Sequence, residues 1–366
     1  MTVNNPIKKI DFIIVALSGG GAERVLTILA NNFADRGYEV SVLTFNESSQ
    51  GDDAYVLDPK IERIKLHDGK YSNHKIRSLN SLVSYYKDKT KRPDVIISFV
   101  CFTNLIAILA ARFYGIKIIA SEHTNHHLKG SPEFLVDFTR KYIYRMANFI
   151  TVLTSYDLPY YKDKGSKVVV MPNPTTFSPI ENNNHKREKI ILAVGRLNNY
   201  HIKGFDNLLS IMPPILEKFP EWKLKIIGDG QKGENFLKAS AKKLNIEDRV
   251  IFTGFQNNIA EHMQNASIFV LSSRSEGLPM VLLEAMSQGM VCIAYDCITG
   301  PSDIINDGEN GVLVENQNME EMTNGLTKLV ENETLRFELA ENAIQSLDKF
   351  SMETISSKWE QLFKNL

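Results

Sequence analysis

The sequence is poor in cysteine, in long apolar runs and in net charge, and each shortage excludes a class of protein. Its three cysteines, Cys101, Cys292 and Cys297, are too few and too scattered for a disulfide framework, and none forms the Cys-x-x-Cys pair typical of zinc sites. A formal net charge of -1 gives the whole chain no attraction to nucleic acid. The first apolar run, residues 10–17, is too short for a signal-peptide core or a membrane span. We therefore expect a cytoplasmic protein that is either soluble or bound peripherally at a membrane surface.

What the sequence does contain is a regular alternation of short β-branched runs with helical patterns along almost all of its 366 residues. Expected strands in the first half include 94–99, 117–121 and 149–153, and expected helices include 104–113 and 133–146. Alternation of this kind indicates parallel sheets covered by helices on both faces, which is the α/β class.

A Pro-Asn-Pro segment at 172–174 and the polar stretch 181–188 interrupt the alternation, which then starts again. Such a segment is typical of a hinge between domains. We predict two doubly wound, Rossmann-like domains, one at 1–178 and one at 179–350. Ligands of such sheets bind at the carboxyl ends of the strands, so the loops that follow strands are the candidate sites.

Two acidic residues, Glu276 and Glu284, stand eight positions apart around a Gly-Leu-Pro break. The pattern predicts a strand, then a loop that holds Glu276, then a helix that holds Glu284 in its first turns. A helix start offers unpaired N–H groups and a positive dipole end, which suit an anion such as a diphosphate. The two carboxylates could hold hydroxyls of a sugar and of a ribose. The alternative is one helix-capping acid and one solvent-exposed acid.

Three glycines, Gly19, Gly20 and Gly21, follow the first expected strand and open a helix. They permit a tight turn and close approach of the backbone to a phosphate or a sugar. A dinucleotide fingerprint requires a further glycine where Arg24 stands, which disfavours a dinucleotide site. A tight turn without a ligand remains an alternative.

Three histidines, His123, His126 and His127, follow the strand expected at 117–121. The adjacent pair cannot easily aim at one ion, and no set of carboxylates or thiols accompanies it, so we expect no metal. We interpret His123, nearest the strand end, as a polar group that faces the ligand, and His126 and His127 as surface residues.

Two cations and two glycines surround the first helix start of the second half. Arg196 follows Gly195, and Lys203 precedes Gly204. This combination suits a diphosphate, because Arg can form paired hydrogen bonds, Lys supplies a point charge, and the backbone supplies N–H donors. The common alternative is that both side chains are simply solvated. A later loop at a strand end contributes Phe255, whose ring could support a nucleotide base.

Together these segments resemble glycosyltransferase family 4. The resemblance rests on GGGAER, SEHTN, GRL with KGF, IGDG, TGF, SRSEGLPMVLLEAMSQG, TGPSDII and DGENGVLV. It covers nearly the whole chain in the same order, and the Glu-x7-Glu block is its most specific part. The resemblance implies the GT-B fold, two Rossmann-like domains facing a cleft. The first would bind the acceptor and the second the nucleotide-sugar donor, with the last helix, 351–366, packed back on the first.

The resemblance also implies catalytic roles for four residues. Arg196 and Lys203 would hold the diphosphate and stabilise the leaving nucleotide. Glu276 would contact hydroxyls of the donor sugar, and His123 would lie near the reacting centre. Negative charge grows on the diphosphate as the sugar–phosphate bond breaks, and preorganised cations stabilise it.

Substrate-binding roles are implied for further residues. Glu284 would hold the ribose, Phe255 would lie near the base, and the loop of Gly19, Gly20 and Gly21 would approach donor and acceptor. The segment facing the diphosphate would be Gly277, Leu278, Pro279, Met280 and Val281.

The family transfers sugars with retention of anomeric configuration and without a bound metal. No convincing Asp-x-Asp metal motif is present, and Arg196 with Lys203 could replace the cation, so we expect no metal and no cofactor. Two features depart from many relatives: residues 198–202 lengthen the loop before Lys203, and Ile298 stands where similar sequences have proline.

We expect transfer of a hexose or N-acetylhexosamine from a nucleotide sugar, UDP by resemblance, to a glycan or polyprenyl-diphosphate-linked acceptor in surface-polysaccharide assembly. The stretch from Lys60 to Arg92 is rich in Lys and Arg, and tyrosines lie between these cations. It could bind an anionic membrane surface, each cation adding about 1 kcal/mol, or be an ordinary solvated face.

Other functions stay open at this stage. One is an NAD-dependent sugar-nucleotide oxidoreductase or epimerase that uses Tyr160 and Lys164 as its acid/base pair. This alternative does not explain why the chain has a second α/β domain. Another is a non-catalytic partner subunit of a glycosyltransferase, and a third is a phosphorylase or epimerase of the same fold.

Overall fold

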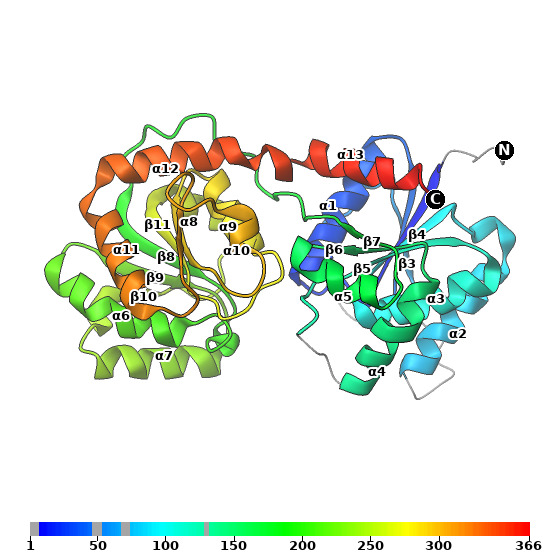
Figure 1. Ribbon diagram of the computed structural model, residues 1–366, viewed down its shortest axis with the longest axis horizontal. Coiled ribbons are helices and arrows are strands. Elements are labelled where there is room, and N and C mark those ends of the chain that lie inside the picture. Colours follow the sequence, from blue (N-terminus) through cyan, green and yellow to red (C-terminus); the bar gives the residue numbers. More distant parts are fainter. Residues whose placement is uncertain (1–6, 46–52, 67–73, 128–131) are drawn as a thin grey trace. The chain divides into compact units, whose positions relative to one another are not determined.

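The computed structural model describes residues 7–45, 53–66, 74–127 and 132–366 (Figure 1). The chain divides into two compact units. Unit 1 comprises Met1–Pro174 together with Phe350–Leu366, and unit 2 comprises Thr175–Lys349. The division between Pro174 and Thr175 falls at the end of the Pro-Asn-Pro segment, whereas the sequence predicts the boundary at 178/179.

Unit 1 is built on a seven-stranded parallel sheet with the strand order β3-β2-β1-β4-β5-β6-β7. The strands are β1 (Lys9–Ile14), β2 (Glu39–Thr44), β3 (Glu62–Lys65), β4 (Val95–Phe99), β5 (Lys117–Ser121), β6 (Phe149–Val152) and β7 (Val168–Val170). The helices are α1 (Gly21–Asp35), α2 (His74–Lys87), α3 (Cys101–Tyr114), α4 (Glu133–Phe138), α5 (Leu158–Asp163) and α13 (Met352–Phe363). β4 is buried along its whole length, as expected for a central parallel strand covered on both faces.

Unit 2 repeats this architecture with a six-stranded parallel sheet in the order β10-β9-β8-β11-β12-β13. The strands are β8 (Glu188–Val194), β9 (Lys223–Ile227), β10 (Val250–Phe252), β11 (Ala266–Leu271), β12 (Val291–Tyr295) and β13 (Val312–Val314). The helices are α6 (Phe205–Lys218), α7 (Gln231–Lys243), α8 (Ile259–Asn265), α9 (Met280–Ser287), α10 (Pro301–Ile304), α11 (Met319–Glu331) and α12 (Glu333–Gln345). Both units are therefore Rossmann-like and doubly wound, which confirms the predicted fold class.

In each sheet the winding direction reverses between two neighbouring central strands. The reversal lies between β1 and β4 in unit 1 and between β8 and β11 in unit 2. Open α/β sheets bind their ligands just beyond the carboxyl ends of the strands at this reversal point. The loops after β8 and β11 are those that carry Arg196, Lys203 and Glu276.

The last helix, α13, belongs to unit 1 and packs on α1. Its buried Trp359 and Phe363 lie on the apolar side, where the Phe363 ring is 5.6 Å from that of Phe33. Ser351 caps the helix by accepting a hydrogen bond from the Thr354 amide at 3.2 Å. Both apolar burial and capping thus hold α13 in place.

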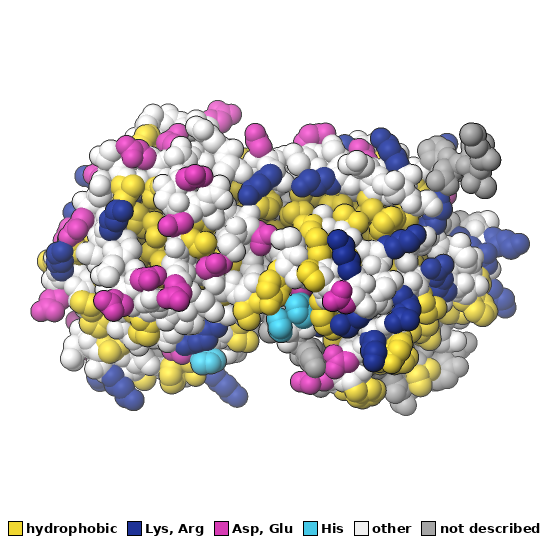
Figure 2. Space-filling model, in the orientation of Figure 1, with side chains coloured by type: hydrophobic (Ala, Val, Ile, Leu, Met, Phe, Trp, Pro, Cys, Tyr) yellow, Lys and Arg dark blue, Asp and Glu magenta, His cyan; other side chains and the backbone are white. Residues whose placement is uncertain are grey.

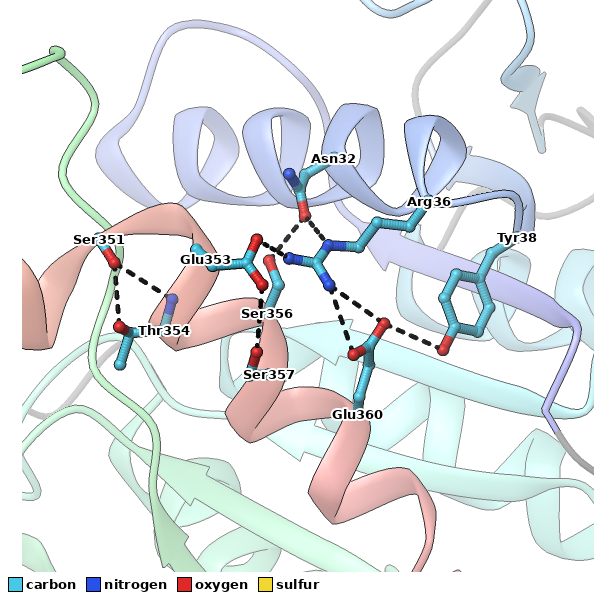
Figure 3. A network of polar contacts seen from close by, with 9 residues as sticks. All are labelled: Asn32, Arg36, Tyr38, Ser351, Glu353, Thr354, Ser356, Ser357 and Glu360. Atoms are coloured by element: carbon cyan, nitrogen blue, oxygen red, sulfur yellow. Dashed lines mark hydrogen bonds and ion pairs between the residues drawn. The ribbon is translucent and has the colours of Figure 1, made fainter.

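A polar network joins α13 to α1 beside this apolar contact (Figure 3). Arg36, which follows α1, reaches Glu353 at 2.5 Å and Glu360 at 3.4 Å. The Ser356 hydroxyl donates to Asn32 Oδ1 at 2.6 Å. One guanidinium therefore ties two turns of the C-terminal helix to the first helix of unit 1.

The helix expected at 133–146 changes its pitch along the way. α4 continues as a π-helical turn at Thr139–Ile143 and a 3-10 turn at Tyr144–Met146. Arg140 and Tyr144 stand in this irregular part, and both side chains contact the buried carboxylate of Glu122. π turns inside helices are frequent at functional sites.

Candidate active site

The predicted cation Lys203 and the predicted carboxylate Glu276 meet in unit 2. They lie 73 positions apart in the sequence, and Lys203 Nζ is 2.7 Å from Glu276 Oε1. Their side chains are only 24% and 11% exposed. The Ser273 hydroxyl donates to the same carboxylate oxygen at 2.6 Å. The structure thus places a largely shielded ion pair at the reversal point of the sheet.

Arg196 lies just after the end of β8, on the loop that leads to Lys203. It begins a 3-10 turn at Leu197–Asn199, in which Leu197 is buried and anchors the loop. The Arg196 side chain is exposed, and within the described parts of the chain it forms no hydrogen bond or ion pair. It is therefore available for an anionic ligand.

The lengthened loop before Lys203 is anchored to its surroundings. Tyr200 stacks on Phe236 of α7 with ring centroids 4.4 Å apart, and the Phe205 amide donates to the Tyr200 carbonyl at 2.9 Å. The Ser272 hydroxyl donates to the Lys203 carbonyl at 2.9 Å. These contacts bring the loop back to the end of β11, where Lys203 reaches Glu276.

Gly204 allows this close approach of two backbones. Its φ is 67°, and a Cβ at this position would lie 1.8 Å from the Ser272 carbonyl oxygen. A side chain there would push the two loops apart. The Lys-Gly-Phe segment is therefore a packing device as well as a source of charge.

The segment predicted to face the diphosphate leads into α9. Gly277 and Leu278 precede Pro279, which is the N-cap residue, and Met280 and Val281 form the first turn. Leu278 is buried and fixes the loop, and the Thr299 hydroxyl donates to the Glu276 carbonyl at 2.5 Å.

Glu284 lies in the body of α9 and is buried. The Thr176 hydroxyl, at the start of unit 2, donates to Glu284 Oε1 at 2.5 Å. Glu284 and Glu276 have different partners, the Thr176 hydroxyl for Glu284 and the Lys203 ammonium for Glu276. Phe255 follows the edge strand β10 and is 71% exposed, so its ring is open to a ligand.

In unit 1, His123 packs at the end of β5. Its ring stacks on Phe99 at 4.6 Å, and its Nε2 lies 3.1 Å from the Ser121 hydroxyl. The residue is partly exposed, but Nδ1 is buried and has no hydrogen-bond partner in the described structure. Burial lowers the pKa of the ring to about 3, so His123 is neutral at physiological pH.

In the glycine loop of unit 1, backbone amides already donate hydrogen bonds to a residue of the helix that follows. The Glu23 carboxylate accepts from the amides of Gly19 at 2.5 Å and Gly20 at 2.9 Å, which forms a capping box. An anion at these two amides would have to displace Glu23. The third glycine, Gly21, begins α1.

Sequence reasoning missed a buried polar network below the SEHTN segment. Arg140 and Glu122 form an ion pair at 3.4 Å with side chains 1% and 2% exposed. Arg140 also donates to the His126 carbonyl at 2.9 Å. Buried Asp157 accepts from His126 Nδ1 at 2.7 Å. The interpretation of His126 as a surface residue is therefore wrong, because a buried carboxylate holds it in place.

Val100, at the reversal point of unit 1, was also missed. It joins β4 to α3 with a φ of 67°, which is rare for a β-branched residue and costs about 1–3 kcal/mol. No residue type in the sequence indicates this conformation, since glycine or asparagine would be the usual choice.

No group of three or more His, Cys, Asp or Glu side chains that could bind a metal occurs in the described ranges. Among those same residues, no helix has the length and apolar character required to cross a bilayer.

Part of the basic stretch between Lys60 and Arg92, residues 67–73, lies outside the described residues. On the face drawn in Figure 2, Lys and Arg side chains are spread over unit 1.

Comparison with known proteins places this geometry in a family. Residues 19–176 match the family described as Glycosyltransferase Family 4, and residues 175–346 match Glycosyl transferases group 1. An uncharacterized glycosyltransferase of Haemophilus influenzae is 32% identical over 97% of this chain and 99% of its own.

One further relative and one solved structure are also similar over nearly the whole chain. An α-1,4-N-acetyl-D-galactosaminyltransferase of Campylobacter jejuni that acts on a diphosphate-undecaprenol-linked saccharide is 31% identical over 97% of this chain and 98% of its own. The crystal structure of Anabaena HepE in complex with UDP has a TM-score of 0.78 and 18% identity, covering 98% of this chain and 100% of that one. The two family models cover residues 19–346, and the Haemophilus influenzae and Campylobacter jejuni relatives are 32% and 31% identical over 97% of the chain. The chain therefore belongs to glycosyltransferase family 4 and is a glycosyltransferase of the GT-B fold.

Proposed function

We propose that this enzyme transfers a hexose or N-acetylhexosamine from a UDP-sugar, with retention of configuration and without a metal. The acceptor is a glycan or a polyprenyl-diphosphate-linked saccharide in cell-surface polysaccharide assembly. The observation that carries the proposal is the contact between Lys203 and Glu276 at the reversal point of unit 2, with exposed Arg196 on the same loop as Lys203. The Campylobacter jejuni relative acts on a lipid-diphosphate-linked saccharide and HepE was crystallised with UDP, which supports the two substrate classes.

Each residue then has a defined task. Arg196 and Lys203 hold the diphosphate and stabilise the negative charge that grows as the sugar leaves. When the diphosphate takes the Lys203 ammonium, the Glu276 carboxylate can accept hydrogen bonds from sugar hydroxyls in place of that ion pair. The donors at the start of α9 assist the diphosphate.

The remaining predicted residues bind substrate. Glu284 receives the ribose hydroxyls in exchange for the Thr176 hydroxyl, and Phe255 supports the base. Neutral His123 serves as a hydrogen-bonding group toward the acceptor side rather than as a cation, because its pKa is about 3.

Ligand-dependent thermal unfolding tests the donor class. UDP and one UDP-hexose or UDP-N-acetylhexosamine should raise Tm, since a ligand that binds only the folded state stabilises it. Arg196→Ala should lose this stabilisation, whereas Lys232→Ala, at an exposed position on α7, should keep it. Stabilisation by GDP or ADP but not by UDP would overturn the assigned nucleotide.

Release of UDP only when a polyprenyl-diphosphate saccharide is supplied would then separate transfer from epimerisation and from phosphorolysis. UDP-sugar conversion without an acceptor would favour a same-fold epimerase instead. A protein that binds UDP-sugar and transfers nothing would support the partner-subunit alternative.

We further propose work in the cytoplasm or at the inner face of the membrane, with the basic stretch resting on anionic lipid. Lys87, Lys89 and Lys91 changed together to Glu should abolish binding to phosphatidylglycerol vesicles. The matched control changes three lysines of α7 in unit 2, Lys238, Lys242 and Lys243. Equal vesicle binding by both triple variants would contradict the membrane proposal.

A further inference from the structure

Four aromatic rings cluster beyond the carboxyl ends of β5 and β6 in unit 1: His126, His127, Tyr156 and Tyr160. The His126 ring stacks on Tyr160 at 4.3 Å and 18°, and on Tyr156 at 5.5 Å and 19°. His127 lies 4.1 Å from His126, and its Nε2 is 2.9 Å from the Tyr156 hydroxyl. The donor-binding residues of the proposed function include none of these rings.

Buried polar residues hold the cluster in place. Buried Asp157 accepts from both the backbone amide of His126, at 2.9 Å, and its Nδ1, at 2.7 Å. Buried Arg140 donates to the His126 carbonyl and is itself paired with buried Glu122. A buried ion pair is costly to desolvate, so its use to hold one loop carbonyl indicates that the position of this loop matters.

Two of the four rings, those of Tyr156 and His127, are exposed to solvent. Tyr156 is 45% exposed and His127 is exposed. An aromatic ring that served only the core would be covered, because burying such a ring is a main stabilising contribution. Tyr156 and His127 are instead held in place with exposed rings, at the sheet edge where open α/β sheets bind ligands. Tyr160 is covered by the stacked His126 ring and by the Lys164 ammonium, which lies 3.4 Å from its ring centroid.

This composition suits a saccharide. A pyranose ring presents a face of C–H bonds that stacks on an aromatic ring, and hydroxyls that need a few fixed polar partners. His126 Nδ1 lies 2.7 Å from the Asp157 carboxylate, and Nε2 is the other polar atom of the ring. The Tyr156 hydroxyl and His127 add further polar atoms beside the rings.

We propose that the exposed rings of His127 and Tyr156, supported by the packed rings of His126 and Tyr160, form a stacking site for a pyranose ring of the acceptor saccharide. This inference rests on the proposed function, because it identifies the acceptor side of the same reaction. Asp157, which fixes His126, is a positioning residue. The site recognises the apolar face of the sugar, so it discriminates by which C–H bonds that face exposes.

The test uses ligand-observed NMR on the full chain saturated with UDP, with methyl α-glycosides of glucose, galactose, N-acetylglucosamine and N-acetylgalactosamine as probes. At least one glycoside should bind the wild type, with its C–H signals shifted upfield by the rings. Tyr156→Ala should weaken this binding about tenfold or more, as expected for the loss of a stacking contact. Tyr156→Phe, which keeps the ring, should retain binding within about twofold.

Tyr142→Ala is the matched control, because Tyr142 is also 45% exposed in unit 1 but lies outside the cluster. It should bind the glycoside as the wild type does. Equal binding by Tyr156→Ala and wild type, or equal losses in Tyr156→Ala and Tyr142→Ala, would overturn the inference. A wild type that binds UDP but none of the four glycosides would also overturn it.

Failure of the proposed function gives a different result. In that case the wild type shows no stabilisation by UDP or by UDP-sugars, whatever the glycosides do. The two failures are read from different ligands and can therefore be told apart.

Discussion

Replacing the buried Asp11 with Asn should remove a pH dependence from the stability of unit 1. Asp11 lies in β1, where the Tyr86 hydroxyl donates to Oδ2 at 2.7 Å and Oδ1 has no hydrogen-bond partner in the described structure. Burial raises the pKa of this carboxyl from 3.8 to about 7. Asn has the same shape and can still accept from Tyr86, but it carries no charge.

The sign of the effect follows from proton binding. The unfolded chain releases this proton near pH 3.8, whereas the folded chain holds it up to about pH 7. Folding therefore takes up a proton between these values, and the free energy of unfolding falls as pH rises through this window. A tenfold change in proton affinity is worth about 1.4 kcal/mol, so the loss from this one group reaches an upper bound of about 4 kcal/mol above pH 7.

Denaturant unfolding of wild type and Asp11→Asn, from about pH 4.5 to about pH 8.5, measures this difference. Hydrogen exchange at the β1 amides assigns it to unit 1, because a chain of two units need not unfold in one step. The variant should gain stability over the wild type as pH rises. Asp163→Asn, at an exposed position on α5, is the control and should keep the wild-type slope. Parallel pH profiles for Asp11→Asn and wild type would refute the reasoning.

Three further variants test individual contacts by chemical denaturation. Gly204→Ala should destabilise unit 2 by about 2 kcal/mol or more, because its Cβ would overlap the Ser272 carbonyl; an unchanged midpoint would contradict that packing. Arg36→Met should cost unit 1 about 1 kcal/mol, and less in about 1 M salt, since the network around it is partly exposed; a loss that does not depend on salt would argue against ion pairing. Glu122→Gln should cost about 3–5 kcal/mol, because Arg140 would stay buried without its carboxylate; a wild-type midpoint would show that the pair is not needed.

The parts of this protein that sequence reasoning predicted are those with a strong periodic or positional signal. Alternating strands and helices predicted two doubly wound units. The units divide at the end of the Pro-Asn-Pro segment, not at the predicted 178/179. The rule that ligands bind after strands selected Arg196, Lys203 and Glu276. The structure then added that Lys203 and Glu276 touch, which no local pattern could reveal because they are 73 positions apart.

The misses have physical causes. The strained Val100 has no signature, because its residue type opposes its conformation. His126 looked like a surface residue since its partner, Asp157, comes from a different loop. In the glycine loop, the capping role of Glu23 emerged only from its hydrogen bonds.

The central claim is that Glu276 acts on the donor sugar while the cations beside it hold the diphosphate. The most direct measurement is the initial rate of sugar transfer from UDP-sugar to a polyprenyl-diphosphate saccharide by wild type and Glu276→Ala, together with the UDP dissociation constant of each. We expect a rate loss of about 10²-fold or more with little change in UDP affinity, as for removal of a preorganised polar contact in a transition state. Wild-type turnover by Glu276→Ala would contradict the account.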